Sequence, residues 1–173
     1  MMIQVILDDI TKVELDAIIN SANKSLLSGS GVCGVIHKAA GKELEIECKK
    51  YGPLEEGNSI ITKGYNLKSR NVIHTVAPKY YLLQENREEL LRSCYYTSLK
   101  LADENNLKAI GYPAIGIGVY KWPIELALTI AVEEVAKYMK HENRNIDNVY
   151  FIVRDERLKK AYEFLIGKYT IGE

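Results

Sequence analysis

Apolar runs of strand length alternate with segments of helical periodicity along most of the chain. Six strands are predicted, at Ile3–Leu7, Ala17–Ile19, Ser59–Thr62, Asn71–Val76, Leu107–Tyr112 and Val149–Val153. Four helices are predicted, over Gly34–Lys50, Glu88–Asn105, Pro123–His141 and Glu156–Leu165. This alternation predicts an α/β protein, a three-layer α/β/α sandwich with a mixed, largely parallel central sheet.

Composition narrows the classes of protein that this chain could be. The 173 residues predict one domain, residues 1–173, and the 23 basic residues balance the 23 acidic ones. Zero net charge makes nucleic acid an unexpected partner, and no apolar run is long enough to span a membrane. The N-terminal sequence lacks the basic region of a signal peptide, and the three widely spaced cysteines favour neither disulfides nor a zinc site. We expect a cytoplasmic protein, acting as a monomer without metal or cofactor.

Two glycine turns carry the candidate chemistry. Asn20 and Asn23 end an apolar run, and the loop Gly29–Gly34 then leads into a helical pattern. The second turn, Gly116–Gly118, follows the strand Leu107–Tyr112. Ligands of parallel sheets bind beyond the carboxyl ends of the strands, and glycine lets backbone N–H groups approach an anion at a helix N-terminus. The two turns therefore predict a pocket for a phosphate-bearing ligand.

The first glycine loop spells GxGxxG, the fingerprint of dinucleotide-binding proteins. That fingerprint needs its first glycine directly after a strand, whereas Ser21–Ser28 intervene here. The next strand also ends in Thr62-Lys63, without the acidic residue that would hold a ribose. A P-loop is excluded as well, because the chain contains no Gly-Lys-Ser/Thr sequence. We interpret the GxGxxG match as accidental.

Several motifs together resemble the macrodomain family, which binds ADP-ribose. They are Asn20-Ser21-Ala22-Asn23, Ser28–Gly41 with its glycine loop, Val72-Ile73-His74-Thr75-Val76, and Tyr112–Tyr120 followed by Pro123. Their order and their spread over almost the whole chain make the resemblance specific. It implies the macrodomain fold and ADP-ribose as the ligand.

The resemblance also implies ligand contacts at the two ends of ADP-ribose. Asp9, with Ile10 beside it, would bind the adenine, although an aspartate here also suits an Asx turn. Asn23 would bind hydroxyls of the distal ribose, because an amide offers both donors and acceptors, while Asn20 braces the loop. Arg154 either stacks on the adenine or pairs with Asp155 at the surface.

Backbone groups of both glycine turns would hold the ribose and the diphosphate. The implied contacts are Gly29, Ser30, Gly31, Val32 and Cys33 in the first turn, and Ala114, Gly116, Ile117, Gly118, Val119 and Tyr120 in the second. Ser30 departs from the usual run of glycines and would restrict the backbone if a positive φ were needed. Gly116-Ile117 replaces a Ser-Thr pair that many relatives carry, with the loss of one hydroxyl donor.

Cys33 is the departure that bears on catalysis. Many hydrolytic macrodomains have an aspartate at this point, and a thiol cannot replace a carboxylate as general base near neutral pH. Certain viral members that remove ADP-ribose resemble this chain in their Gly-Val-Cys sequence. Cys33 either shapes the pocket or takes part in the chemistry, and the catalytic candidates are Asn23, Gly31 and Cys33.

Other prominent residues have simpler interpretations. We expect His37 and His74 to be satisfied structural histidines, and Trp122 to cap the start of the helix at Pro123. The run Glu85–Arg92 is expected to be a solvated helix face.

Two functions remain from different classes. The first is a hydrolase that removes mono-ADP-ribose from acidic side chains of proteins and also deacetylates O-acetyl-ADP-ribose. The second is a module that binds ADP-ribose without turnover. The expected partners are ADP-ribose and mono-ADP-ribosylated proteins.

Overall fold

The computed structural model describes residues 2–170, which form one six-stranded sheet and five α-helices. The strands are β1 (Met2–Leu7), β2 (Ala17–Ala22), β3 (Ser59–Lys63), β4 (Asn71–Val76), β5 (Ala109–Tyr112) and β6 (Asn148–Val153). The helices are α1 (Gly31–Ala40), α2 (Lys42–Cys48), α3 (Arg87–Glu104), α4 (Ile124–His141) and α5 (Glu156–Thr170), with a short 3₁₀ helix, η1 (Tyr80–Leu82).

The sheet has the order β1-β6-β5-β2-β4-β3 and is parallel except for the edge strand β3. A mixed, largely parallel sheet is therefore confirmed. Because five strands run the same way, their carboxyl ends share one edge of the sheet. The loops that follow these strands lie along that edge in the same order.

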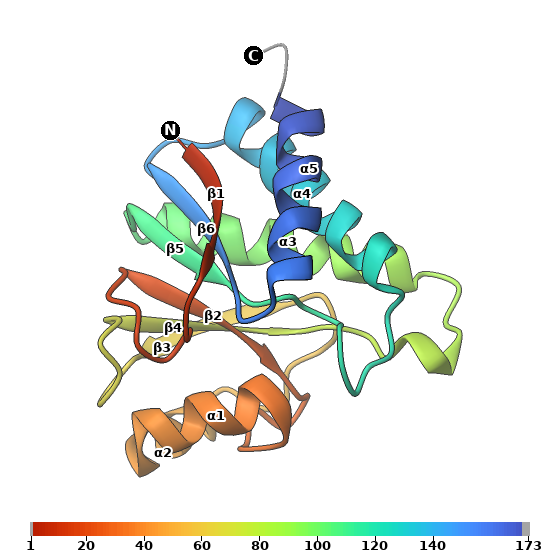
Figure 1. The fold of residues 1–173 in the computed structure, drawn as a ribbon. Helices are drawn as coiled ribbons and strands as arrows, with labels where there is room; N and C mark the ends of the chain where they lie inside the picture. Colours follow the sequence, from red (N-terminus) through yellow and green to blue (C-terminus); the bar gives the residue numbers. More distant parts are fainter. Residues whose placement is uncertain (1, 171–173) are drawn as a thin grey trace.

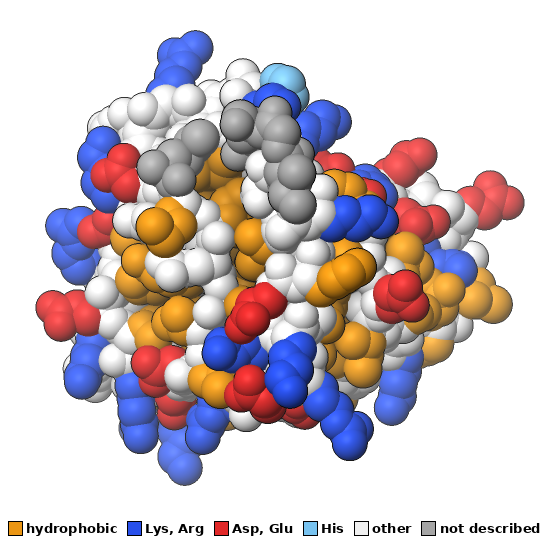
Figure 2. All heavy atoms as spheres, turned by 45° about the horizontal axis from the view of Figure 1, so that its top comes forward, with side chains coloured by type: hydrophobic (Ala, Val, Ile, Leu, Met, Phe, Trp, Pro, Cys, Tyr) orange, Lys and Arg blue, Asp and Glu red, His pale blue; other side chains and the backbone are white. Residues whose placement is uncertain are grey.

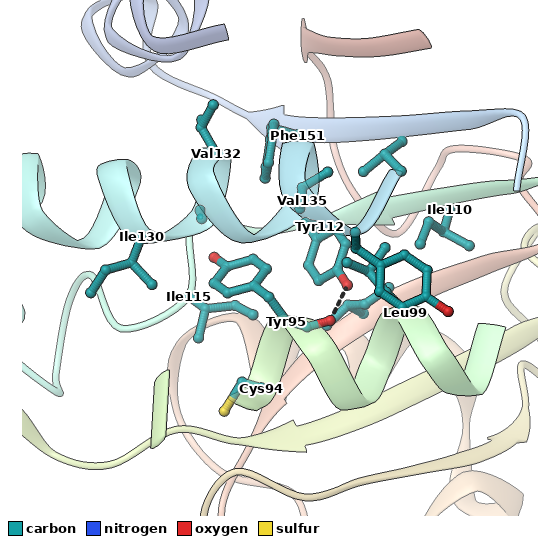
Figure 3. Packing of buried hydrophobic residues seen from close by; sticks show 14 of the residues in the cluster. Cys94, Tyr95, Leu99, Ile110, Tyr112, Ile115, Ile130, Val132, Val135 and Phe151 are labelled. Atoms are coloured by element: carbon teal, nitrogen blue, oxygen red, sulfur yellow. Dashed lines mark hydrogen bonds between the residues drawn. The ribbon is translucent and has the colours of Figure 1, made fainter. Parts of the chain in front are cut away.

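Helices cover both faces of the sheet. Figure 1 shows α1 and α2 on one side and α3, α4 and α5 on the other. Each side has its own apolar core, and the larger core, between the sheet and α3, α4 and α5, is rich in aromatic rings. Figure 3 shows Tyr95 of α3 and Tyr112 of β5 in that core, with their ring centroids 5.0 Å apart. Such a three-layer arrangement buries the sheet on both faces, which parallel strands require.

The middle of the sheet is weakly paired. β2 and β5 share only the register pairs Ala17–Ile110 and Ile18–Gly111. Beyond Ile18, β2 continues to Ala22 beside β4 alone, while β5 ends at Tyr112. The two strands therefore part toward their carboxyl ends, and this opening lies between the two glycine turns.

The predicted helix over Gly34–Lys50 is wrong, because the structure has two helices, α1 and α2, joined at Gly41. Gly41 has φ 91° and ψ 178°, a combination that essentially only glycine adopts and that interrupts the helix. A Cβ at Gly41 would also approach Asn66 Nδ2 to 2.9 Å. The helix also begins earlier than predicted, at Gly31, so only Gly29 and Ser30 of the loop Gly29–Gly34 precede it.

The other predicted elements are present with shifted ends. β2 extends three residues beyond the predicted Ile19, β5 begins two residues after Leu107, and α5 continues past Leu165 to Thr170. Pro123 is the N-cap residue of α4 rather than its first helical residue. On the face in Figure 2, basic and acidic side chains are interspersed. Among residues 2–170, no helix combines the length and apolar character needed to cross a membrane.

Candidate functional site

A cavity of about 270 Å³ lies at the carboxyl edge of the sheet, where β2 and β5 part. Three segments line it: the end of β2 with Asn23, the loop and first residues of α1, and the loop after β5. The lining residues are Ser21, Asn23, Gly29, Ser30, Gly31, Val32, Cys33, Pro113, Ala114, Gly116, Ile117, Gly118, Val119 and Tyr120. The cavity thus unites both glycine turns, as the spacing along the chain suggested.

Backbone conformation explains the glycines at the mouth of the cavity. Gly31 has φ 62° and Gly118 has φ 107°, and a Cβ at either position would meet no atom of the described residues within 4 Å. Their need for glycine is therefore conformational. Ser30 is the N-cap of α1 with φ −95°, an ordinary extended value, so the expected restriction at Ser30 does not arise.

The N-terminus of α1 is suited to an anion. No side chain of residues 2–170 caps it, its first turn holds no acidic residue, and no carboxylate is among the residues that line the cavity. The first N–H groups of a helix carry partial positive charge and lack partners within the helix. A phosphate group would accept hydrogen bonds from these N–H groups and would be attracted by their partial positive charge.

The second turn has its own reason for glycine. Gly116 has φ 90°, and a Cβ there would lie 2.6 Å from Trp122 Cδ1. Trp122 is buried, donates from Nε1 to the carbonyl of Pro78, and packs on Tyr80 with ring centroids 5.0 Å apart. Trp122 therefore anchors this loop to the segment after β4, and its predicted role as a helix cap is wrong. Any side chain at position 116 would therefore collide with the Trp122 ring.

Both asparagines hold local structure. Asn23 Nδ2 donates to the carbonyl of Leu27 at 2.9 Å, and Ser25 Oγ donates to Asn23 Oδ1 at 2.6 Å. Asn20 is fully buried and lies 3.1 Å from His74 Nδ1 and 3.8 Å from Cys33 Sγ. The prediction that Asn20 braces the loop is confirmed. Asn23 braces the segment before α1 and also lines the cavity.

Cys33 lies in the first turn of α1 and is 5% exposed. Its Sγ donates to the carbonyl of Leu27 at 3.5 Å. Burial raises the pKa of the thiol above its usual value, which outweighs the hydrogen bond from Asn20. At neutral pH Cys33 is therefore a neutral thiol and a poor nucleophile.

His74 and His37 lie behind Cys33 in the core. Burial lowers the pKa of His74 to about 3, and its ring nitrogens lie 3.1 Å from Asn20 Nδ2 and 3.0 Å from Thr62 Oγ1. His74 is thus a satisfied structural histidine, as predicted. His37 is not, because neither of its buried ring nitrogens has a hydrogen-bond partner in the described part of the chain.

One group of side chains has the composition of a metal site. The donor atoms of His37, Cys48 and His74 lie within 4.8 Å of one another. Burial and nearby acidic residues raise the pKa of Cys48 to about 12, which opposes the thiolate that a metal ion requires. The hydrogen bonds of His74 occupy both of its ring nitrogens. We assign this group to core packing.

The predicted adenine contacts lie beside the cavity and are not among its lining residues. Asp9 Oδ1 accepts from Thr11 N at 3.0 Å and from Thr11 Oγ1 at 2.7 Å, so the Asx turn is present. These hydrogen bonds lower the pKa of Asp9, with a smaller effect from the Arg154 guanidinium 3.4 Å away. Ile10 is partly buried and packs on the core under α1 and α2.

Arg154 does not pair with Asp155 as one alternative predicted. It pairs with Asp9 instead, while Asp155 accepts from the backbone N of Arg157 at the start of α5. Asp9 and Arg154 meet because they follow the neighbouring parallel strands β1 and β6. The Arg154 side chain remains largely exposed beside Asp9, where a ligand could reach it.

One expectation outside the cavity is wrong in part, and two residues of the cavity were not predicted as site residues. The run Glu85–Arg92 is not wholly solvated, since Arg92 Nη1 bridges Glu133 and Glu134 of α4 at 2.9 and 3.1 Å. Ser21 and Pro113 line the cavity although the sequence did not single them out. Ser21 lies in β2 and Pro113 directly follows β5, so both could have been predicted from the tendency of ligands to bind at the carboxyl ends of parallel strands.

Comparison with known proteins places the chain in a family. The family model "Macro domain" matches residues 19–131. The chain is 40% identical over 168 residues to an O-acetyl-ADP-ribose deacetylase of Escherichia fergusonii, covering 95% of this chain and 94% of that protein. It is 42% identical over 162 residues to the ADP-ribose glycohydrolase MACROD2 of Xenopus laevis, covering 93% of this chain but 39% of that protein.

Solved structures agree in fold and sequence. A mutant of the Oceanobacillus iheyensis macrodomain with ADPR has a TM-score of 0.91 at 38% identity, covering 98% of this chain and 93% of that one. The Trypanosoma brucei macrodomain in complex with ADP-ribose has a TM-score of 0.88 at 37% identity, covering 95% and 69%. Because the family model spans more than half of the chain and these relatives match nearly all of it, the chain belongs to the Macro domain family.

Proposed function

We propose that this protein binds ADP-ribose and hydrolyses mono-ADP-ribose from acidic side chains of modified proteins, with O-acetyl-ADP-ribose as a second substrate. The observation that carries the proposal is the single cavity that combines an uncapped helix N-terminus, two positive-φ glycines and Asn23. The glycohydrolase and deacetylase names among its relatives support a hydrolase in general. The protein would act as a monomer in a reducing cytoplasm, consistent with its three free cysteines.

ADP-ribose would lie along the carboxyl edge of the sheet, with its successive parts at the ends of β1 and β6, then β5, then β2. Asp9 and Arg154, after β1 and β6, bind the adenine, with Ile10 supporting the turn. The diphosphate lies between Gly31 at the N-terminus of α1 and Gly118 in the loop after β5. The distal ribose then reaches Asn23 after β2. Three strand spacings separate β1 from β2, about 14 Å in all.

Catalysis would come from positioning rather than from a protein acid or base. Cys33 and Tyr120 are the titratable side chains among the residues that line the cavity, and burial raises the pKa of both. Neither is a base at neutral pH. A water held between the first glycine turn and the phosphate of the ligand would attack the anomeric carbon, and backbone N–H groups would stabilise the diphosphate.

The alternative is a module that binds ADP-ribose without turnover, and the neutral Cys33 thiol favours it. The two are separated by incubating the protein with a substrate auto-modified on Glu or Asp by mono-ADP-ribose and following release of the label. Release at a rate well above that of buffer supports the hydrolase. Micromolar ADP-ribose binding without release leaves only the binding module.

Two variants test the assignment of the ribose site. Asn23→Ala removes the amide that we place beside the distal ribose, together with its hydrogen bonds to Leu27 and Ser25, and we expect kcat/KM to fall about tenfold or more. His37→Ala lies behind the cavity and should cost much less. Equal losses in the two variants would contradict the placement of the ribose at Asn23.

A further inference from the structure

A second cavity, of about 270 Å³, adjoins the first across a shared wall. Asn23 and Tyr120 line both cavities. The other lining residues of the second cavity are Lys24, Glu56, Val76, Ala77, Lys79, Leu82 and Gln84. Val76 and Ala77 end β4 or follow it, so this cavity lies at the next strand end beyond β2.

The strand order indicates which part of the substrate would lie at the second cavity. If adenine lies at β1 and β6, diphosphate at β5 and distal ribose at β2, then the anomeric carbon faces the end of β4. The chemical group beyond that carbon in a modified protein is the acceptor side chain. From this order we infer that the second cavity is an acceptor subsite, which takes the acidic side chain and adjoining polypeptide of the mono-ADP-ribosylated protein. This inference rests on the proposed function.

The charges of the cavity fit a carboxylate. Lys24 Nζ lies 3.7 Å from Glu56 Oε1 and its side chain is 58% exposed, so it is free to move toward a second anion. Lys79 Nζ lies over the Tyr120 ring, 5.8 Å from its centroid, at the wall between the cavities. Two lysines against one carboxylate give the lining a net positive charge.

That charge would serve the leaving group. When water attacks the anomeric carbon, the bond from this carbon to the acceptor oxygen breaks and its electron pair stays on the acceptor carboxylate. The water supplies the hydroxyl of the free ribose, and its proton passes to solvent. Lys24 and Lys79 would attract the carboxylate as its charge develops.

Gln84 offers an unfilled contact in the same cavity. Its Nε2 donates to Glu56 Oε1 at 3.2 Å, which fixes the orientation of the amide. Its Oε1 is buried and has no hydrogen-bond partner among residues 2–170. A backbone N–H of the acceptor polypeptide would supply the missing donor. Beside it, Tyr81, Leu82 and Leu83 are 50%, 58% and 67% exposed and would contact apolar parts of that polypeptide.

The test changes the two lysines and compares three ligands. In the double variant Lys24→Gln, Lys79→Gln we expect the affinity for free ADP-ribose to change less than about twofold. Turnover of O-acetyl-ADP-ribose, whose acyl group is too short to fill the cavity, should also be kept. The value of kcat/KM for a protein mono-ADP-ribosylated on Glu should fall about fivefold or more at low salt.

A matched control variant removes two positive charges at a site away from both cavities. Lys38→Gln, Lys42→Gln alters exposed lysines of α1 and α2 that line neither cavity and should leave all three measurements unchanged. Equal losses for all ligands in the Lys24 and Lys79 variant, or no loss for the modified protein, would overturn the inference. Weaker binding of an ADP-ribose dimer, with the modified protein unaffected, would assign the cavity to a second nucleotide and overturn it too.

A binding measurement keeps this test separate from turnover. A Glu-rich peptide carrying a hydrolysis-resistant ADP-ribose should bind more tightly than free ADP-ribose, and the lysine variant should remove that difference. This result would support the acceptor subsite even if the wild-type protein released no label. Equal affinities of wild type for the two ligands would refute the subsite while leaving hydrolysis open.

Discussion

Gly34→Ala tests how closely the first glycine loop is packed. Gly34 lies in the first turn of α1, and a Cβ there would lie 2.2 Å from the carbonyl oxygen of Gly29. Carbon and oxygen atoms in contact are normally about 3.3 Å apart. The loop would have to move by roughly 1 Å, and it is backbone rather than a flexible side chain that must yield.

The displacement has two measurable consequences. Overpacking of this size costs about 2 kcal/mol of the free energy of unfolding, which for a domain of this length lowers Tm by about 4–8 °C. Moving Gly29 also disturbs Asn23, whose Nδ2 would lie 3.1 Å from a Cβ at Gly29. Misaligned contacts to a charged ligand should weaken ADP-ribose binding about tenfold or more.

Calorimetric titration with ADP-ribose and thermal unfolding measure the two effects, with two glycine variants as controls. In Gly167→Ala, in α5, the added Cβ meets no atom of residues 2–170 within 4 Å, and the variant should raise the free energy of unfolding by about 0.5–1 kcal/mol. Gly31→Ala also meets nothing but has φ 62°, so it should cost about 1–2 kcal/mol through backbone strain alone. If Gly34→Ala melts and binds as wild type does, the loop is not closely packed and the reasoning fails.

Three further variants or conditions probe the site and the core. Cys33→Ala should keep ADP-ribose affinity within about threefold, because a neutral thiol contributes shape rather than charge; calorimetry showing a collapse of binding would give the thiol a larger role. The pKa of His74 lies near 3 in the folded protein and near 6.5 in the unfolded chain, so below pH 6.5 only the unfolded chain binds the extra proton. The free energy of unfolding should therefore fall by about 1.4 kcal/mol for each pH unit below 6.5. NMR should show that the imidazole is still neutral at pH 5, and a titration midpoint near pH 6 would refute this. Asp103→Ala removes a buried carboxylate that accepts from Tyr138 Oη at 2.9 Å and from Asn145 N at 2.8 Å. Denaturant unfolding should show that the free energy of unfolding falls by about 2–4 kcal/mol, while the affinity for ADP-ribose stays unchanged. A loss of affinity would mean that the surroundings of Asp103 are coupled to the cavity.

The sequence predicted the layers and the position of the cavity because both follow from local patterns. Strand-length apolar runs and helical periodicity are properties of neighbouring residues, and glycine turns after parallel strands must share one edge. The break at Gly41 was missed because its positive φ interrupts an apolar pattern that continues on both sides. A single glycine in a helical pattern does not reveal its φ.

Contacts between distant segments were beyond such reasoning. Arg154 had Asp155 as its neighbour in sequence, but the register of β1 and β6 brings Asp9 closer. The need for glycine at Gly116 comes from the Trp122 ring, and the ring is held by the Pro78 carbonyl. The unpartnered nitrogens of His37 likewise depend on the packing of α1 against the sheet.

The short pairing between β2 and β5 has a consequence for ligand-linked stability. Only two register pairs join the half of the sheet made of β1, β6 and β5 to the half made of β2, β4 and β3. Asn23 and the N-terminus of α1 belong to the second half, while the loop after β5 and Arg154 belong to the first. A ligand bound to both halves would hold them together across the β2–β5 ladder, which has the fewest register pairs in the sheet. Its binding energy would appear as slower amide exchange in Ala17–Ala22 and Ala109–Tyr112, the strands on either side of the joint.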